Sequence, residues 1–131
     1  MNTKELITRR LSRAYKNLEV ARSLLADEFY EDSVSKSYYA LFFAAKALLL
    51  TKNLDPKRHS GVISFFSQYF VKTGELEKEL ADILKFAQKE RISADYDEFY
   101  IASPEEARHQ LENAEKFLQR AKEILQEKGF L

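Results

Sequence analysis

Two short clusters of charged and proton-carrying side chains are the places in this sequence where chemistry could occur. The first is Lys57-Arg58-His59-Ser60-Gly61, at the predicted start of a helix. Backbone N–H groups at a helix start attract anions, and two cations beside an imidazole strengthen that attraction. Lys57, Arg58 and His59 are therefore candidate phosphate-binding residues. A plainer interpretation is that Ser60 or His59 caps the helix while the cations are solvated.

The second cluster, Arg91-Ile92-Ser93-Ala94-Asp95-Tyr96-Asp97, lies near the end of a later predicted helix. Arginine suits a phosphate because its planar guanidinium binds bidentately and keeps its charge. Four residues separate Arg91 from Tyr96, so we expect both side chains near one helix end. An i,i+4 ion pair between Arg91 and Asp95 is the simpler interpretation of the spacing alone.

Several other kinds of site are excluded by composition and motif. The chain has no cysteine, and His59 and His109 are its two histidines, so a zinc site would need carboxylates to complete it. Asp95-x-Asp97 lacks the Gly-Ser segment and the strand that hold the metal-binding pair of nucleotidyltransferases. There is no Gly-rich phosphate loop, HExxH helix or nucleophile elbow. We expect neither a metal nor a cofactor.

The overall composition is that of one globular domain covering residues 1–131. Hydrophobic residues make up 45% of the chain, and 21 Lys and Arg balance 21 Asp and Glu, with the cations in excess in the first half. The N-terminal residues lack the apolar core of a signal peptide. The longest nearly apolar run, residues 38–50, contains Lys46 and is too short to span a bilayer. We expect a cytoplasmic protein that does not enter a membrane.

The periodicity of apolar residues predicts an all-α, up-and-down bundle of five helices and no sheet. Residues 92–102 are expected to form a loop or a frayed extension. The first and fifth helices carry matching apolar stripes at alternating spacings of four and three, so we expect them to be the two long outer helices, adjacent and antiparallel. Ser103, Pro104 and Glu106 fit the start of the fifth helix, and Gly129 fits its end. The expected helices cover approximately residues 3–27, 32–52, 60–71, 75–91 and 104–128.

The second predicted helix differs from the others because it is apolar on nearly every side. Residues 38–50 read YYALFFAAKALLL. A helix of this kind must be covered all round. The cover is supplied either by the other helices of one chain or, in part, by a second subunit.

These strings together resemble the HEPN domain family. SVSKSYYALFFAAKALLL, RHSGVISFFSQYFVKTG and RISADYDEFY occur in this order between two long amphipathic helices, and the resemblance spans almost the whole chain. It implies a helical bundle that forms homodimers with a functional cleft at the dimer interface. Many relatives are encoded beside a minimal nucleotidyltransferase, and a number of those pairs are toxin–antitoxin systems. Active relatives are metal-independent ribonucleases.

The ribonuclease motif of the family is an arginine, four to six variable residues, and a histidine. Arg91 matches the arginine, but Tyr96, Asp97 and Glu98 occupy the three permitted histidine positions. Ile92 follows Arg91 where active members generally carry a polar residue. Histidine exchanges protons near neutral pH, whereas tyrosine titrates near pH 10, roughly 3 units too high. The neighbouring carboxylates further oppose its ionisation and repel RNA.

Three functional hypotheses follow from the resemblance and its departures. The leading hypothesis is a homodimeric module that binds a nucleotide through Lys57, Arg58, His59 and Arg91, or serves as a substrate through a tyrosine, together with a minimal nucleotidyltransferase in a toxin–antitoxin-like pair. The second is a metal-independent ribonuclease toxin that uses Arg91 and Tyr96 from both subunits. The third is a purely structural dimer.

Overall fold

The computed structural model describes residues 1–131 and contains helices but no strand. This confirms the prediction of an all-α fold with five helices. The elements, in chain order, are α1 (Thr3–Ala26), α2 (Tyr30–Leu50), α3 (His59–Phe66), a π-helical turn η1 (Ser67–Val71), α4 (Lys78–Tyr96) and α5 (Pro104–Glu127).

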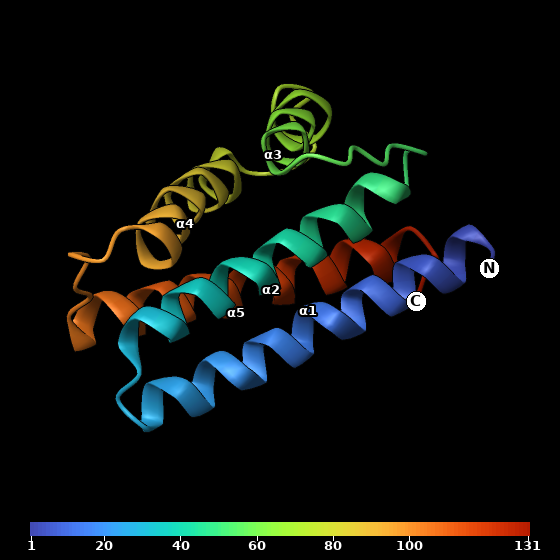
Figure 1. Ribbon diagram of the computed structural model, residues 1–131. Coiled ribbons are helices and arrows are strands. Elements are labelled where there is room, and N and C mark those ends of the chain that lie inside the picture. Colours follow the sequence, from blue (N-terminus) through green and yellow to red (C-terminus); the bar gives the residue numbers. More distant parts are fainter.

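The long helices α1, α2 and α5 lie side by side (Figure 1). The chain runs along α1, returns along α2, and runs along α5 in the same direction as α2, so α1 and α5 are antiparallel. They are also neighbours, because the Tyr15 hydroxyl donates a hydrogen bond to the Leu118 carbonyl at 3.4 Å. Arg22 and Glu115 form an ion pair across the same interface. The predicted pairing of the two long outer helices is confirmed.

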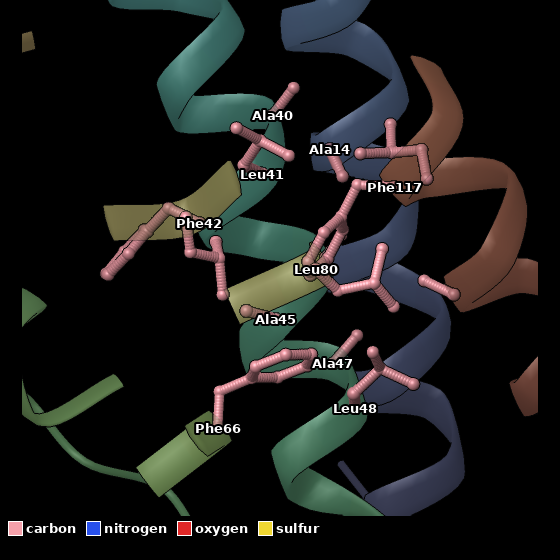
Figure 2. Close-up of a cluster of buried hydrophobic side chains, with 14 of the residues drawn as sticks. Ala14, Ala40, Leu41, Phe42, Ala45, Ala47, Leu48, Phe66, Leu80 and Phe117 are labelled. Carbon is pink, nitrogen blue, oxygen red and sulfur yellow. The ribbon is translucent and has the colours of Figure 1, made fainter. Parts of the chain in front are cut away.

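Helix α2 lies at the centre of the molecule and contacts α1, α3, α4 and α5. α3 and α4 cover the side of α2 opposite α1 (Figure 1). Within residues 38–50, only Tyr39, Phe43 and Lys46 are half-buried, and every other residue is buried. Figure 2 shows Ala40, Leu41, Ala45 and Leu48 among buried side chains of the neighbouring helices. The chain itself thus covers most of its apolar central helix, which needs no second subunit for that purpose.

The fifth helix begins and ends as its sequence predicts. The Glu106 N–H donates to the Ser103 hydroxyl oxygen at 3.0 Å, and Pro104 occupies the first turn. Gly129 has a φ of 80°, which glycine adopts without a Cβ clash. The Phe130 N–H then donates to the Leu125 carbonyl at 2.9 Å, which closes the helix end.

Two helix boundaries differ from the prediction. α4 begins at Lys78 and continues to Tyr96, whereas the expected helix covered residues 75–91. No proline or glycine interrupts residues 92–96, and contacts from Arg91 and Ser35 to Asp95 hold the added turn. The expected helix at residues 60–71 is divided into α3 and the wider turn η1.

Candidate functional site

Arg91 and His59, which belong to separate candidate sites in the sequence, contact the same tyrosine. The Tyr38 hydroxyl and His59 Nδ1 share a hydrogen bond of 2.7 Å. The Arg91 guanidinium carbon lies 5.0 Å from the centre of the Tyr38 ring, within cation–π range. α2 supplies Tyr38, the first turn of α3 supplies His59, and α4 supplies Arg91. We call Tyr38, Tyr39, Phe42, His59 and Arg91 the Tyr38 cluster.

His59 is held by stacking as well as by its hydrogen bond. Its ring lies 4.1 Å from the Phe42 ring, centre to centre, with 19° between the planes. Burial, reinforced by the charges of Arg91 and Lys46, lowers the pKa of His59 below its ordinary value of 6.5. The imidazole is therefore mostly neutral at pH 7, with one ring nitrogen able to accept a proton. Its second nitrogen, Nε2, makes no hydrogen bond within the chain.

Tyr38 is fully buried, and its hydroxyl is not suited to act as a catalytic acid. Burial raises the pKa of its hydroxyl to about 12, although the nearby Arg91 opposes the shift. The hydroxyl therefore keeps its proton throughout the physiological range. Its part in the cluster is to orient the His59 ring and to offer a π face to Arg91.

Arg91 is a buried cation whose partners are incomplete. The residue is 7% exposed, and its nearest carboxylate oxygen, Asp95 Oδ2, lies 3.8 Å from Nη1. Arg91 Nε is buried and has no hydrogen-bond partner. The Ser35 hydroxyl donates to the other Asp95 oxygen at 2.8 Å, so that carboxylate is shared. The expected i,i+4 ion pair is present, but it leaves the guanidinium with unused donor capacity.

The half-buried ring of Tyr39 forms the outer edge of the cluster. The Arg91 guanidinium lies 5.8 Å from the centre of this ring, and the exposed Lys36 ammonium lies at the same distance. An aromatic ring with two neighbouring cations is an arrangement that suits a nucleotide, because the ring stacks on a base and the cations attract phosphate.

The other predicted phosphate-binding residues are displaced from this centre. The Lys57 side chain is 87% exposed and faces Asp55, with 3.9 Å between the ammonium nitrogen and a carboxylate oxygen. Arg10 holds the same carboxylate at 2.9 Å and, through that hydrogen bond, lowers the Asp55 pKa. Arg58 is exposed and precedes α3, and no side chain caps that helix. The capping role considered for Ser60 or His59 is therefore wrong.

Tyr96 lies apart from Arg91. It is 78% exposed, and its hydroxyl forms no hydrogen bond within the chain. Asp97 and Glu98 are exposed as well, and the Asp97 carboxylate accepts from the Phe99 N–H in a local turn. Within one chain, the structure brings Arg91 together with His59 and Asp95 but leaves Tyr96 outside the Tyr38 cluster.

Sequence reasoning missed Tyr38, Tyr39 and Phe42 because they belong to an apolar run that is typical of a core helix. Lys46, the one charge in that run, was the available signal. Its ammonium lies 5.4 Å from the Phe42 ring centre, and burial lowers its pKa. No group of three or more His, Asp or Glu side chains is placed to hold a metal ion. None of the helices is both long and apolar enough to cross a membrane.

Comparisons with solved structures agree with this architecture. The crystal structure of TT1696 from Thermus thermophilus superposes with a TM-score of 0.76, covering 94% of this chain and 98% of that one at 22% identity. At that identity the similarity concerns the fold.

Sequence relatives are similar along most of their length. "Putative toxin MJ0142" of Methanocaldococcus jannaschii is 41% identical over 121 residues, which are 92% of this chain and 82% of that protein. "Putative toxin MJ0605" of the same organism is 43% identical over 87% of this chain and 84% of that protein. A UPF0332 protein of Thermotoga maritima is 36% identical over 97% of both chains. The profile of the HEPN domain matches residues 7–125, and the chain belongs to the HEPN domain family.

Proposed function

We propose that this chain is a homodimeric HEPN module that binds a nucleotide at the Tyr38 cluster and works with a minimal nucleotidyltransferase in a toxin–antitoxin-like pair. The observation that carries the proposal is the incomplete pairing of Arg91. Removing a charge from water costs several kcal/mol unless partners replace the lost hydration. Asp95 at 3.8 Å replaces only part of the hydration that Arg91 loses. The Nε atom of Arg91 has no hydrogen-bond partner at all. A phosphate at this position supplies the missing acceptor oxygens.

The names of two relatives support the toxin part of the proposal. Both proteins of Methanocaldococcus jannaschii carry "toxin" in their names and cover most of this chain at above 40% identity. A toxin needs a partner that restrains it, and the family's association with minimal nucleotidyltransferases supplies the chemistry of that partner.

The dimer is supported by exposed apolar side chains around the end of α4. Ile92, Phe99 and Ile101 are 46%, 83% and 82% exposed. Large apolar side chains gathered in one region mark interaction surfaces. Light scattering at micromolar concentration is expected to give twice the chain mass, and Ile92→Asp with Phe99→Asp is expected to give the single mass. A monomeric wild type would contradict the proposed dimer. A stable two-fold interface is expected to bury at least about 1,000 Å² in total.

Tyr96 fits the role of acceptor for the partner. Of the seven tyrosines, it is the one whose side chain is exposed. In the proposed reaction the Tyr96 oxygen attacks the α-phosphorus of a nucleoside triphosphate, loses its proton, and pyrophosphate leaves. Mass spectrometry of the chain coexpressed with a minimal nucleotidyltransferase is expected to show a nucleotidyl group on Tyr96. A Tyr96→Phe chain that still gains this mass would contradict the assignment.

Nucleotide binding is tested directly by equilibrium dialysis with labelled ATP, GTP and AMP. Arg91→Met is expected to weaken the binding, whereas Arg22→Met, which changes an exposed arginine of α1, is expected to leave it unchanged. A wild type that binds none of these nucleotides at millimolar concentration favours the purely structural dimer.

A second candidate function, metal-independent ribonuclease activity, is favoured by the position of His59. Tyr96 lies outside the Tyr38 cluster, but a neutral imidazole that shares Tyr38 with Arg91 is a suitable general base. In a chelator-containing assay on mixed RNA, His59→Ala is then expected to reduce cleavage by roughly 10²–10⁴-fold, the usual cost of losing a general base. Tyr96→Phe leaves cleavage unchanged. Absence of wild-type cleavage leaves the binding module as the function.

A further inference from the structure

A groove between α4 and α5 has a lining that differs from the Tyr38 cluster in both charge and position. Its deeper part is a cavity of about 480 Å³, within the size range of ligand pockets. The walls carry the aromatic rings of Phe86 and Tyr100 and the carboxylates of Glu90, Glu105 and Glu106. No lysine or arginine lines the cavity.

The three carboxylates of the cavity have no cationic side chain as a partner, and Glu105 and Glu106 lie in the first turn of α5, where the helix dipole favours negative charge. None of Glu90, Glu105 and Glu106 belongs to any of the ion pairs of the chain. Glu79, nearer the start of α4, is by contrast paired with Lys116 at 2.6 Å. Burial and the negative charge of Glu90 raise the pKa of Tyr100, so its ring stays neutral beside these carboxylates. The cavity therefore attracts a cation.

Gln110 gives a second and independent sign of a ligand. The residue is 3% exposed, lines the cavity, and has no side-chain hydrogen bond within the chain. Its amide atoms are not among the fully enclosed side-chain atoms of the chain that lack a partner, so they open into the cavity, where a bound group can reach them. An amide oxygen in the wall of an acidic cavity is a natural acceptor for an N–H donor of a bound group.

The groove continues past the cavity along α4. A shallower hollow of about 360 Å³ shares Phe86 and His109 with the cavity and adds Glu79 and Asp82. The lining thus follows one face of α4 for two to three turns, with Glu79 paired to Lys116 and Asp82 outside every ion pair. Such a length fits a chain of several residues better than a single small ion.

We propose that this groove binds a basic segment of a partner protein, with one arginine side chain in the deeper cavity. A guanidinium is planar, so it stacks on the half-exposed Phe86 ring while its in-plane N–H groups donate to carboxylates and to the Gln110 oxygen. A lysine ammonium has no plane to stack and fewer donors. The proposal is independent of nucleotide binding, since the groove shares no residue with the Tyr38 cluster.

The test is fluorescence anisotropy of a labelled peptide of alternating arginine and glycine, titrated with the full chain at about 0.15 M salt. The double variant Glu90→Gln with Glu106→Gln is expected to weaken binding at least tenfold, and Phe86→Ala several-fold. Glu127→Gln is the matched control, because it removes one exposed carboxylate from the far end of α5. It is expected to change the affinity less than twofold. The corresponding lysine peptide is expected to bind several-fold more weakly than the arginine peptide.

Three results overturn the proposal. The first is no binding of the arginine peptide at millimolar concentration. The second is equal weakening by Glu127→Gln and by the double variant, which would show a general charge effect. The third is free arginine amide binding as tightly as the peptide, which would make the groove a small-molecule site. Circular dichroism of each variant confirms that the helices are retained before its affinity is compared.

Discussion

Arg91 and Tyr96, which begin and end the motif segment in α4, differ in their exposure to solvent. Arg91 is 7% exposed and packs on two tyrosine rings, whereas Tyr96 is 78% exposed and makes no side-chain hydrogen bond. Five positions along a helix correspond to a rotation of about 140°, so the two side chains leave α4 on different sides. Asp95, one position earlier, returns to the side of Arg91 and reaches it.

This comparison shows that sequence spacing and spatial neighbourhood identify different partners for Arg91. Along the chain the proton-carrying neighbour is Tyr96, but in the folded chain it is His59, 32 positions earlier by residue number. A motif that is read along one helix is therefore complete only if the other helices, or a second subunit, bring the remaining groups to it.

The largest expected difference between the two regions is in stability. Tyr38→Ala removes a fully buried ring, the hydrogen bond to His59 and the surface on which Arg91 packs. We expect it to lower the free energy of unfolding by about 4 kcal/mol, as for other buried aromatic side chains. Tyr96→Ala is expected to change it by less than about 0.5 kcal/mol. Urea unfolding followed by circular dichroism measures both, and equal losses would show that the two regions do not differ.

Arg91→Met separates the binding role of Arg91 from its packing role. Methionine fills much of the same space without a charge, and Asp95 keeps its hydrogen bond from Ser35, so we expect the free energy of unfolding to fall by only about 0.5 kcal/mol, the usual loss of one i,i+4 ion pair. Nucleotide affinity is expected to fall at least tenfold, which corresponds to about 1.4 kcal/mol. Urea unfolding and equilibrium dialysis on the same preparation give the two values. A strongly destabilised Arg91→Met chain would assign Arg91 to the core instead.

The segment after α4 is held by apolar packing around the buried Ala102 and by one hydrogen bond, whose loss should have a smaller effect. The Ala102 N–H donates to a Glu31 carboxylate oxygen at 2.8 Å, which ties the segment after α4 to the start of α2. Glu31→Ala is expected to cost about 1 kcal/mol, a typical value for one hydrogen bond. Amide hydrogen exchange at Ala102 should accelerate, whereas Asp32→Ala, in the same turn of α2, should leave it unchanged. Equal exchange in both variants would mean that this hydrogen bond does not restrain the segment.

The smallest effect concerns the pH dependence that His59 contributes. Its folded-state pKa lies below 6.5 because of burial and the charges of Arg91 and Lys46. The unfolded chain therefore binds a proton more readily, and the stability from this group is fully present above pH 6.5 and is lost as the pH falls toward the folded pKa. His59→Gln should make the urea midpoint depend less on pH between pH 7 and pH 5 than it does in His109→Gln. An unchanged slope would show that His59 is not held neutral.

The sequence predicted the five helices well because each has a clear stripe of apolar residues or a clear cap. Ser103 and Gly129 mark the ends of α5 in the sequence as they do in the structure. The end of α4 was less predictable, because residues 92–96 contain neither a glycine nor a proline, and their helical form depends on Ser35 reaching Asp95 from α2. Such a contact between distant residues has no local signal.

Only the basic residues of the candidate site, Arg91 and His59, could be predicted from the sequence. Arg91 and His59 stood out by residue type, but their common neighbour Tyr38 was hidden in an apolar run whose pattern indicates burial. Pairing them requires knowledge of how α3 and α4 cross α2, which apolar periodicity does not contain. The half-buried Lys46 shows the same limit, since a single charge in an apolar helix indicates a special environment without naming it.

The turn before α3 limits which mutations the site tolerates. A methyl group at Gly61 would lie 3.2 Å from the Pro56 side chain, closer than ordinary contact. Either α3 or the turn would have to move, and α3 carries His59 in its first turn. A substitution at Gly61, which lies outside the Tyr38 cluster, would thus move the His59 imidazole away from the Tyr38 hydroxyl. During evolution, residues 56 and 61 should therefore change together or not at all.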